Sequence, residues 1–253
     1  FIGVSVKIIN VVNPVIVSSG IAIGALIGSL IALKVKMTSI PEMVALFNGF
    51  GGLATFFIAW SEFNAIPDNV FQYVLIMLTT YIGGVTFSGS IIAYGKLSEK
   101  LKIQKDSIIT KLFTTLFYLS ILFLVYSTAL TSFIEIPIDF YKVLLILTLL
   151  GGIGFVLPIG GGDMPVVISL LNSFSGIAAA FAGLLLLNNV LIVAGSLVGA
   201  SGLILTVIMA KAMNRSIGNI LFVGYASTSK SSGSKETGEV KPINVSDAYL
   251  ILE

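Results

Sequence analysis

The stretch "PIGGGDMPVVISLLNSFSGIAAAFAGLLLL" (158–187) carries a single charge, at Asp163, and is uncharged from residue 164 to its end. An apolar run of about 20 residues is long enough to cross roughly 30 Å of hydrocarbon as an α-helix. The stretch therefore predicts a transmembrane helix that begins directly after Asp163.

The rest of the chain has the same apolar character. Of its 253 residues, 56% are hydrophobic and only 10% are charged, whereas an average soluble domain carries roughly a quarter charged residues. Apolar runs and the residues that interrupt them predict an all-α fold, a polytopic transmembrane helical bundle of about eight spans. The predicted spans are 1–13 (incomplete), 14–33, 41–60, 70–95, 110–132, 141–158, 164–187 and 189–210.

Charge alternates between the connections of these spans. Basic residues follow the second, fourth and eighth spans, whereas the connections after the third and fifth are acidic. By the positive-inside rule, the basic side and the C-terminus face the cytoplasm, or the matrix of a mitochondrion. The residues that set this orientation are Lys34, Lys36, Lys96, Lys100, Lys102, Lys105, Lys111, Lys211 and Arg215 on one side, and Glu62, Asp68, Glu135 and Asp139 on the other.

Several kinds of site are excluded by what the sequence lacks. It has no cysteine and no histidine, and without cysteine there are no disulfides or thiolate metal sites. It also has no phosphate-binding glycine loop, no metal-ligand cluster and no nucleophile–base pair. The sequence also lacks a basic patch interleaved with aromatic residues, which is the pattern that indicates nucleic-acid binding. We therefore expect no catalytic residue, no metal and no cofactor site in this chain, and no nucleic acid among its partners.

Two asparagines lie near the middle of the membrane in predicted spans, Asn48 on the third and Asn172 on the seventh. Polar side chains at this depth are costly unless they are partnered, and they tend to mark ion or solute pathways. The alternative is that each amide bonds a facing hydroxyl or carbonyl and merely holds two helices together. We favour a hydrated path. The small or polar residues on these faces and on those of the fourth and eighth spans are Gly52, Thr55, Thr86, Ser90, Ser169, Gly176, Ala179, Gly183, Gly195, Gly199, Ser201, Gly202 and Thr206.

Glycines four residues apart recur in two of the spans. Gly20, Gly24 and Gly28 form one such series, and Gly195 and Gly199 form another. This spacing lets two helix backbones approach closely, and packing is what holds helices together in lipid. Both series predict helix-packing surfaces.

Asp163 follows three glycines and opens a helix. The unpaired N–H groups and the dipole of a helix N-terminus favour an acid there. They do not explain why the preceding loop has no side-chain bulk, which lets another surface come close to the backbone. We expect Asp163 to contact something in the aqueous phase.

The composition changes after the last span. Residues 1–216 form the predicted transmembrane domain, and 217–244 include a Ser-, Gly- and Lys-rich segment typical of a flexible cytoplasmic linker. Ser246 or Asp247 can cap a helix that begins within 245–253. The linker is either a disordered tail or a tether to a soluble domain.

Four stretches resemble the beta subunit of proton-translocating nicotinamide nucleotide transhydrogenase, in order and at similar spacing over about residues 17–216. They are "MTSIPEMVALFNGFGGLA" (37–54), "GGVTFSGSIIAYGKL" (83–97), "GGGDMPVVISLLNSFSGIAAA" (160–180) and "LIVAGSLVGASGLILTVIMAKAMNRS" (191–216). The resemblance implies that 1–216 is a proton-channel domain and that 245–253 begin an NADP(H)-binding domain.

In this family a peripheral domain binds NAD(H), a membrane domain conducts protons, and a Rossmann-like peripheral domain binds NADP(H). Hydride passes between the nucleotides while a proton crosses the bacterial inner (plasma) membrane or the mitochondrial inner membrane. The resemblance implies an alpha subunit, an NADP(H)-binding domain and a second protomer as partners, with NAD(H) and NADP(H) as cofactors of the full enzyme.

The resemblance also implies a proton path. Asn172, Ser201 and Gly202 match family positions tied to proton conduction, and Asn48 stands where some members carry a histidine regarded as the protonatable group. An amide can orient water but cannot hold a proton. We therefore expect the titratable group to come from the alpha subunit, with water wires past Asn48 and Asn172 as the alternative.

Coupling residues follow from the same resemblance. Asp163, Lys211 and Arg215 match positions at the cytoplasmic face, where the NADP(H)-binding domain docks. Two other functions stay open. The "LPIGGGDMP" break (157–165) is also typical of the discontinuous helices of a secondary solute transporter, and the chain is alternatively a purely structural membrane anchor.

Overall fold

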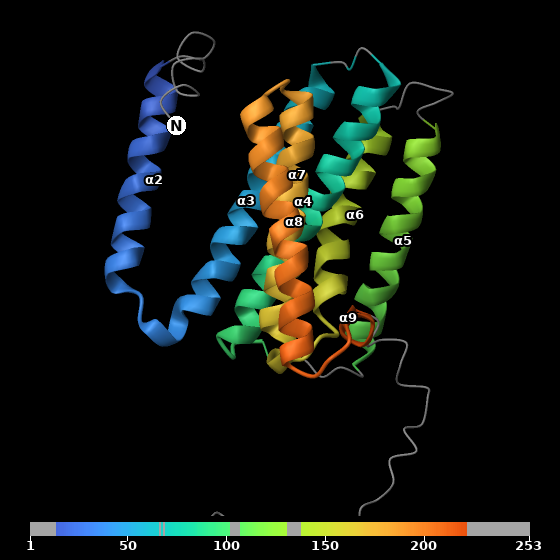
Figure 1. Cartoon of the computed structure of the whole chain (residues 1–253). Helices are drawn as coiled ribbons and strands as arrows, with labels where there is room; N and C mark the ends of the chain where they lie inside the picture. Colours follow the sequence, from blue (N-terminus) through green and yellow to red (C-terminus); the bar gives the residue numbers. More distant parts are fainter. Residues whose placement is uncertain (1–13, 66, 68, 102–106, 131–137, 222–253) are drawn as a thin grey trace, which may run out of the picture.

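The computed structural model describes residues 14–65, 67, 69–101, 107–130 and 138–221, which are helical apart from short connections (Figure 1). All seven long helices are apolar enough to cross a membrane. The all-α prediction is confirmed, and each predicted span from the second to the eighth has its helix. The predicted span 1–13 lies outside the described residues. The helices are α2 (Pro14–Lys34), α3 (Ile40–Asn64), α4 (Val70–Leu97), α5 (Ile108–Leu130), α6 (Ile138–Val156), α7 (Met164–Leu185) and α8 (Asn189–Ala212).

Three short helical segments complete the described chain. The 3-10 turns η1 (Met37–Ser39) and η2 (Gly161–Asp163) lead into α3 and α7, and α9 (Ile217–Leu221) follows α8. The first residues of the predicted linker, 217–221, are thus helical. Residues 222–253, the rest of that linker and the segment beyond it, lie outside the described residues.

The starts of four helices follow from local chemistry. Pro41 and Pro165 lie in the first turns of α3 and α7, where the missing proline N–H costs no intrahelical bond. The side chains of Asn69 and Asn188 accept hydrogen bonds from N–H groups in the first turns of α4 and α8. Such caps satisfy donors that have no partner within the helix.

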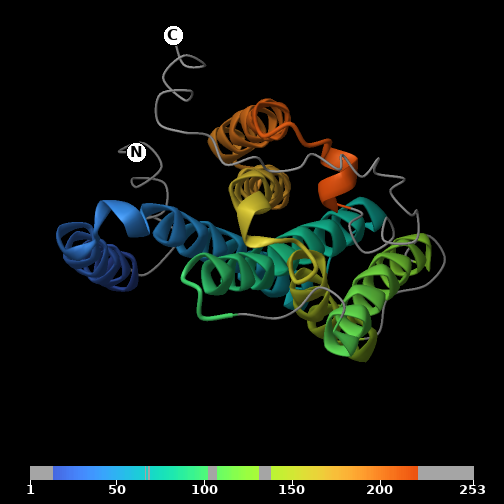
Figure 2. The ribbon, with the colours of Figure 1, turned by 90° about the horizontal axis from the view of Figure 1, so that it is seen from below.

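Helix α4 lies at the centre of the bundle. It packs against α3, α6 and α7, while α8 packs against α7 and α5 packs against α6 (Figure 2). In contrast, α2 stands apart from the other helices in both views, and none of its most apolar window is buried. The series Gly20, Gly24 and Gly28 therefore has no packing partner within the described residues, since nothing lies within 4 Å of a methyl group added at any of them.

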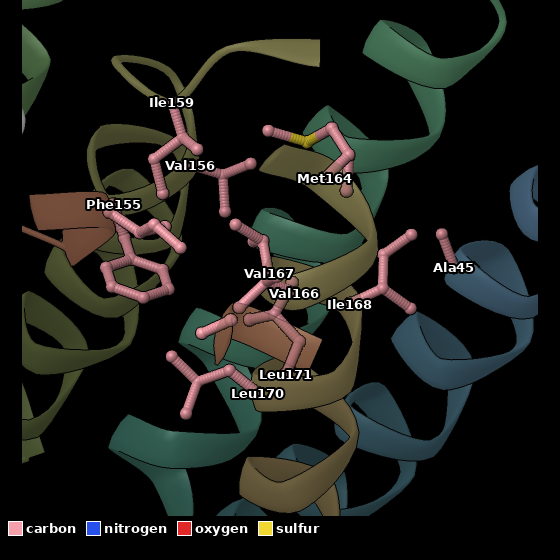
Figure 3. Close-up of a cluster of buried hydrophobic side chains, with 13 residues drawn as sticks. Ala45, Phe155, Val156, Ile159, Met164, Val166, Val167, Ile168, Leu170 and Leu171 are labelled. Atoms are coloured by element: carbon pink, nitrogen blue, oxygen red, sulfur yellow. The ribbon is translucent and has the colours of Figure 1, made fainter. Parts of the chain in front are cut away.

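Two clusters of buried side chains hold the bundle together. The first joins the end of α6 to the start of α7 and includes Phe155, Ile159, Met164 and Leu171 (Figure 3). The second lies toward the other end, where the rings of Phe63 and Tyr141 stack with centroids 3.8 Å apart. Such close packing supplies the attraction between helices in a membrane, where burial of apolar surface supplies none.

Glycines of α7 and α8 make a close contact between these two helices. A methyl group added at Gly176 would meet the backbone nitrogen of Gly199, and one added at Gly202 would lie 2.8 Å from Ser173 Cβ. The packing surface predicted for Gly195 and Gly199 is confirmed, and it extends to Gly202.

Replacing Gly195 with alanine is expected to lower the free energy of unfolding by about 1–3 kcal/mol, the usual cost of overpacking. The added methyl group would meet the backbone nitrogen of Ala180 and lie 2.8 Å from the carbonyl oxygen of Gly176, so the two helices must separate. Unfolding in mixed micelles measures the change. Gly51→Ala is the matched control, because a methyl group there has nothing within 4 Å. Equal losses in both variants would contradict the contact.

Candidate functional site

A polar cluster within the membrane-spanning region joins α3, α4 and α7. The Asn48 Nδ2 group donates to Ser90 Oγ at 3.0 Å, and Ser175 Oγ donates to Asn48 Oδ1 at 2.7 Å. Ser175 Oγ also lies 2.9 Å from the backbone oxygen of Asn172. The cluster is partly buried and carries no charge, so it can pass and orient hydrogen bonds but cannot itself hold a proton.

The structure places the other three predicted path residues outside this cluster. The side chains of Asn172 and Ser201 are exposed on α7 and α8, and the Ser201 hydroxyl bonds the carbonyl of Val198 in its own helix. Gly202 is buried against Ser173 at the crossing of α7 and α8. Gly202 is therefore part of a helix contact, whereas Asn172 and Ser201 face outward from the described bundle.

The predicted coupling residues meet at the end of the bundle where α7 begins and α8 ends. Arg215 Nε lies 3.6 Å from Asp163 Oδ1, and the Asp163 side chain is only 13% exposed against 59% for Arg215. Asn214 adopts a left-handed φ of 53°, and the Arg215 N–H donates to the carbonyl of Ala210. This reversal after the helix satisfies a free carbonyl and turns Arg215 back toward Asp163.

Beside this ion pair, the end of α8 lines an open hollow of about 480 Å³. Lys211, Asn214 and Arg215 lie along it, together with Val207 and Ile217. Both charged groups on the hollow are cationic, which suits an acidic partner surface in the aqueous phase. All three predicted coupling residues thus lie at one end of the molecule. Across the described ranges, no group of three or more acidic or other metal-ligating side chains is placed to hold a metal ion.

Comparison with known proteins shows which family has this sequence. The family model of the NAD(P) transhydrogenase beta subunit matches residues 2–253. The chain belongs to this family. Two NAD(P) transhydrogenase beta subunits, from Rhodospirillum rubrum and from a named strain of it, are each 36% identical over 250 residues, which covers 92% of this chain and 52% of each relative. The chain therefore spans about half the length of the curated relatives it matches.

In this member of the transhydrogenase beta-subunit family, two residues at these sites are not predictable from the sequence. Ser175 lies one turn beyond Leu171 in an apolar helix, and only the approach of α3 reveals it as a partner of Asn48. From the sequence, Lys96 is predicted only to be one of the charges that set the orientation. No sequence signal links Lys96 to α6, which ends 60 residues later.

Lys96 lies in the last turn of α4 and caps the C-terminal end of α6. Its ammonium donates to the carbonyl oxygens of Val156 at 3.2 Å, Leu157 at 2.5 Å and Ile159 at 2.5 Å. The carbonyls at a helix C-terminus have no partner in the helix and attract a cation. Lys96 thereby holds the connection that runs from α6 to Asp163.

Replacing Lys96 with methionine is expected to loosen this connection, because the carbonyls of Leu157 and Ile159 lose the ammonium donor, while that of Val156 keeps only the Ile159 N–H. Each unpaired buried carbonyl costs about 1–3 kcal/mol. Amide hydrogen exchange across residues 157–164 is expected to rise about tenfold or more, since about 1.4 kcal/mol changes an opening equilibrium tenfold. Lys96→Arg keeps the donors and restores most of the protection. Lys100→Met is the control, since Lys100 lies over the Tyr94 ring and makes no such cap. Unchanged exchange in Lys96→Met would refute the role.

Proposed function

We propose that this chain is the membrane subunit of a proton-translocating transhydrogenase and conducts protons coupled to hydride transfer between NAD(H) and NADP(H). The observation that carries the proposal is the cluster of Asn48, Ser90 and Ser175, which links three membrane-spanning helices by hydrogen bonds. It lies on the same bundle as the Asp163–Arg215 pair at the aqueous end.

The cluster sits inside the membrane on the proposed path. At about 1.5 Å per residue, Asn48 lies roughly 12 Å along α3 from Ile40. Amide and hydroxyl groups orient water at that depth, and a titratable group contributed by the alpha subunit would carry the proton. The polar side chains of Asn172 and Ser201 support this division, since both are exposed on the outer faces of membrane-spanning helices. We propose that alpha-subunit helices cover this face.

Coupling takes place at the end with Asp163, Lys211 and Arg215. We propose that the NADP(H)-binding domain docks there and binds differently in its oxidised and reduced states, since only differential binding shifts a conformational equilibrium. A hydride leaves the nicotinamide ring of one nucleotide and adds to that of the other, so the exchange is balanced without a further reductant. The nucleotides bind to peripheral domains, and no cofactor binds to residues 1–216.

The orientation and membrane complete the proposal. We propose that Asp163 and the C-terminus face the cytoplasmic side of a bacterial inner membrane, or the matrix side of a mitochondrial one, which the basic ends of the spans support by the positive-inside rule. Two protomers assemble into a dimer, each with its alpha subunit. Residues 217–244 connect the membrane domain to the NADP(H)-binding domain.

Reconstitution of the assembled enzyme in lipid vesicles tests this function. Hydride transfer from NADH to NADP⁺ is expected to accelerate when a proton gradient is imposed, and to move protons across the vesicle membrane when none is imposed. A protonophore abolishes both effects and serves as the control. Hydride transfer that neither responds to a gradient nor moves protons would refute the proposal. A solute flux through the same vesicles would favour a transporter instead.

A further inference from the structure

A buried hydroxyl next to the Asn48 cluster has no hydrogen-bonding partner among the described residues. Thr86 of α4 is fully buried, at 0% exposure, and its Oγ1 atom is unpaired. Buried polar groups in folded proteins are nearly always hydrogen-bonded, either to protein atoms or to ordered water. Thr86 therefore points to a small hydrogen-bonding ligand.

Other buried hydroxyls of α4 show that a hydroxyl on this helix can find a hydrogen-bonding partner. Thr79 donates to the carbonyl of Leu75 at 2.7 Å, and Ser88 donates to the carbonyl of Gly84 at 3.0 Å. Each satisfies itself one turn back along its own helix. Thr86 makes no equivalent bond to Ile82, so its hydroxyl is left for another group.

The position of Thr86 aligns it with the proposed path. At the crossing of α3 and α4, a methyl group added at Gly52 would lie 2.9 Å from Thr86 Cβ. Gly52 lies one helical turn from Asn48, and Thr86 lies one turn from Ser90, on the faces where these two helices meet. The unpaired hydroxyl is thus the next polar group along the α3–α4 contact.

Ser90 also has a hydrogen-bond donor that is not used. Its oxygen accepts a hydrogen bond from Asn48 at 3.0 Å, and its own hydrogen has no acceptor among the described residues. Two hydroxyls one turn apart therefore each offer a hydrogen bond. A buried water molecule typically makes two to four such bonds.

We propose that Thr86 Oγ1 and Ser90 Oγ, one turn apart on α4, hold an ordered water molecule, which extends the chain of hydrogen bonds from Asn48. The inference rests on the proposed function in one respect, that this water relays protons. In such a relay each oxygen gains one proton as it releases another, so Thr86 and the water return to their starting composition.

Two variants of α4 test the relay in the assembled enzyme in lipid vesicles. Thr86→Val has nearly the same shape and lacks the hydroxyl, and it is expected to lower proton translocation tenfold or more. Thr86→Ser keeps the hydroxyl and retains a rate within twofold of wild type. Thr79→Val is the matched control on the same helix, because the hydroxyl of Thr79 is already satisfied by Leu75. Thr86→Ala, which also lacks the hydroxyl, replaces Thr86→Val in this test if the valine variant does not assemble.

A high-resolution density map of the assembled enzyme supplies an independent readout. It is expected to show a water oxygen within hydrogen-bond distance of Thr86 Oγ1. A dry contact there, or full proton translocation in Thr86→Val and Thr86→Ala while Asn48→Leu is inactive, would overturn the inference and leave the proposed function standing. Full translocation in Asn48→Leu as well would overturn both.

Discussion

Replacing Asn48 with leucine is expected to reduce proton translocation by the proposed transhydrogenase assembly about 100-fold, which corresponds to about 2.7 kcal/mol. Leucine removes both hydrogen bonds of the amide, to Ser90 and to Ser175. It also brings an apolar side chain to the point where three helices meet, which disfavours water there. Proton uptake into vesicles, measured beside NADP(H) binding by the same assembled enzyme, separates this effect from nucleotide binding.

Asn48→His provides the control for this prediction. An imidazole keeps hydrogen-bonding capacity and titrates near pH 6.5 in water, so this variant is expected to conduct protons and to gain a pH dependence between about pH 6 and 7. A wild-type rate of proton translocation by Asn48→Leu would show that the cluster does not lie on the proton path. Loss of NADP(H) binding together with proton movement in the leucine variant would also contradict the prediction, since it indicates misfolding instead of a blocked path.

Replacing Asp163 with asparagine is expected to lower gradient-driven hydride transfer by about 10- to 100-fold, or about 1.4–2.7 kcal/mol. The carboxylate is only 13% exposed and has Arg215 3.6 Å away. Asparagine leaves this arginine without its opposite charge at the face proposed to bind the NADP(H)-binding domain. A partly buried pair broken on one side costs more than an exposed one.

The double variant Asp163→Arg with Arg215→Asp tests whether the pair itself matters. A double-mutant cycle is expected to show a coupling of about 0.5–3 kcal/mol, as for residues in contact. The exposed pair of Lys142 and Asp139 at the opposite end of α6, with side chains 60% and 88% exposed, is the control. Lys142→Met is expected to change the rate less than twofold, since exposed pairs contribute about 0–1 kcal/mol. Normal gradient-driven transfer in Asp163→Asn would refute the coupling role.

The helices of this protein are predictable from sequence because each depends on local composition. The uncharged run 164–187 becomes α7 (Met164–Leu185), and the acid before it lies in the turn η2. The glycine spacing of Gly195 and Gly199 likewise predicts their close contact with α7. These features need only the hydrophobicity and size of neighbouring residues along one helix.

The partner of each polar side chain is decided by the tertiary structure. Asn48 and Asn172 both lie on glycine-lined faces in the sequence, yet Asn48 bonds two other helices and Asn172 is exposed. Ser175 reaches Asn48 across 127 residues of chain, and Lys96 reaches the end of α6 across about 60. Such contacts depend on how far each helix is rotated about its own axis and which helices lie beside it. Those quantities come from the packing of the whole bundle, because the membrane treats every apolar face alike and leaves close contact between side chains to select the arrangement.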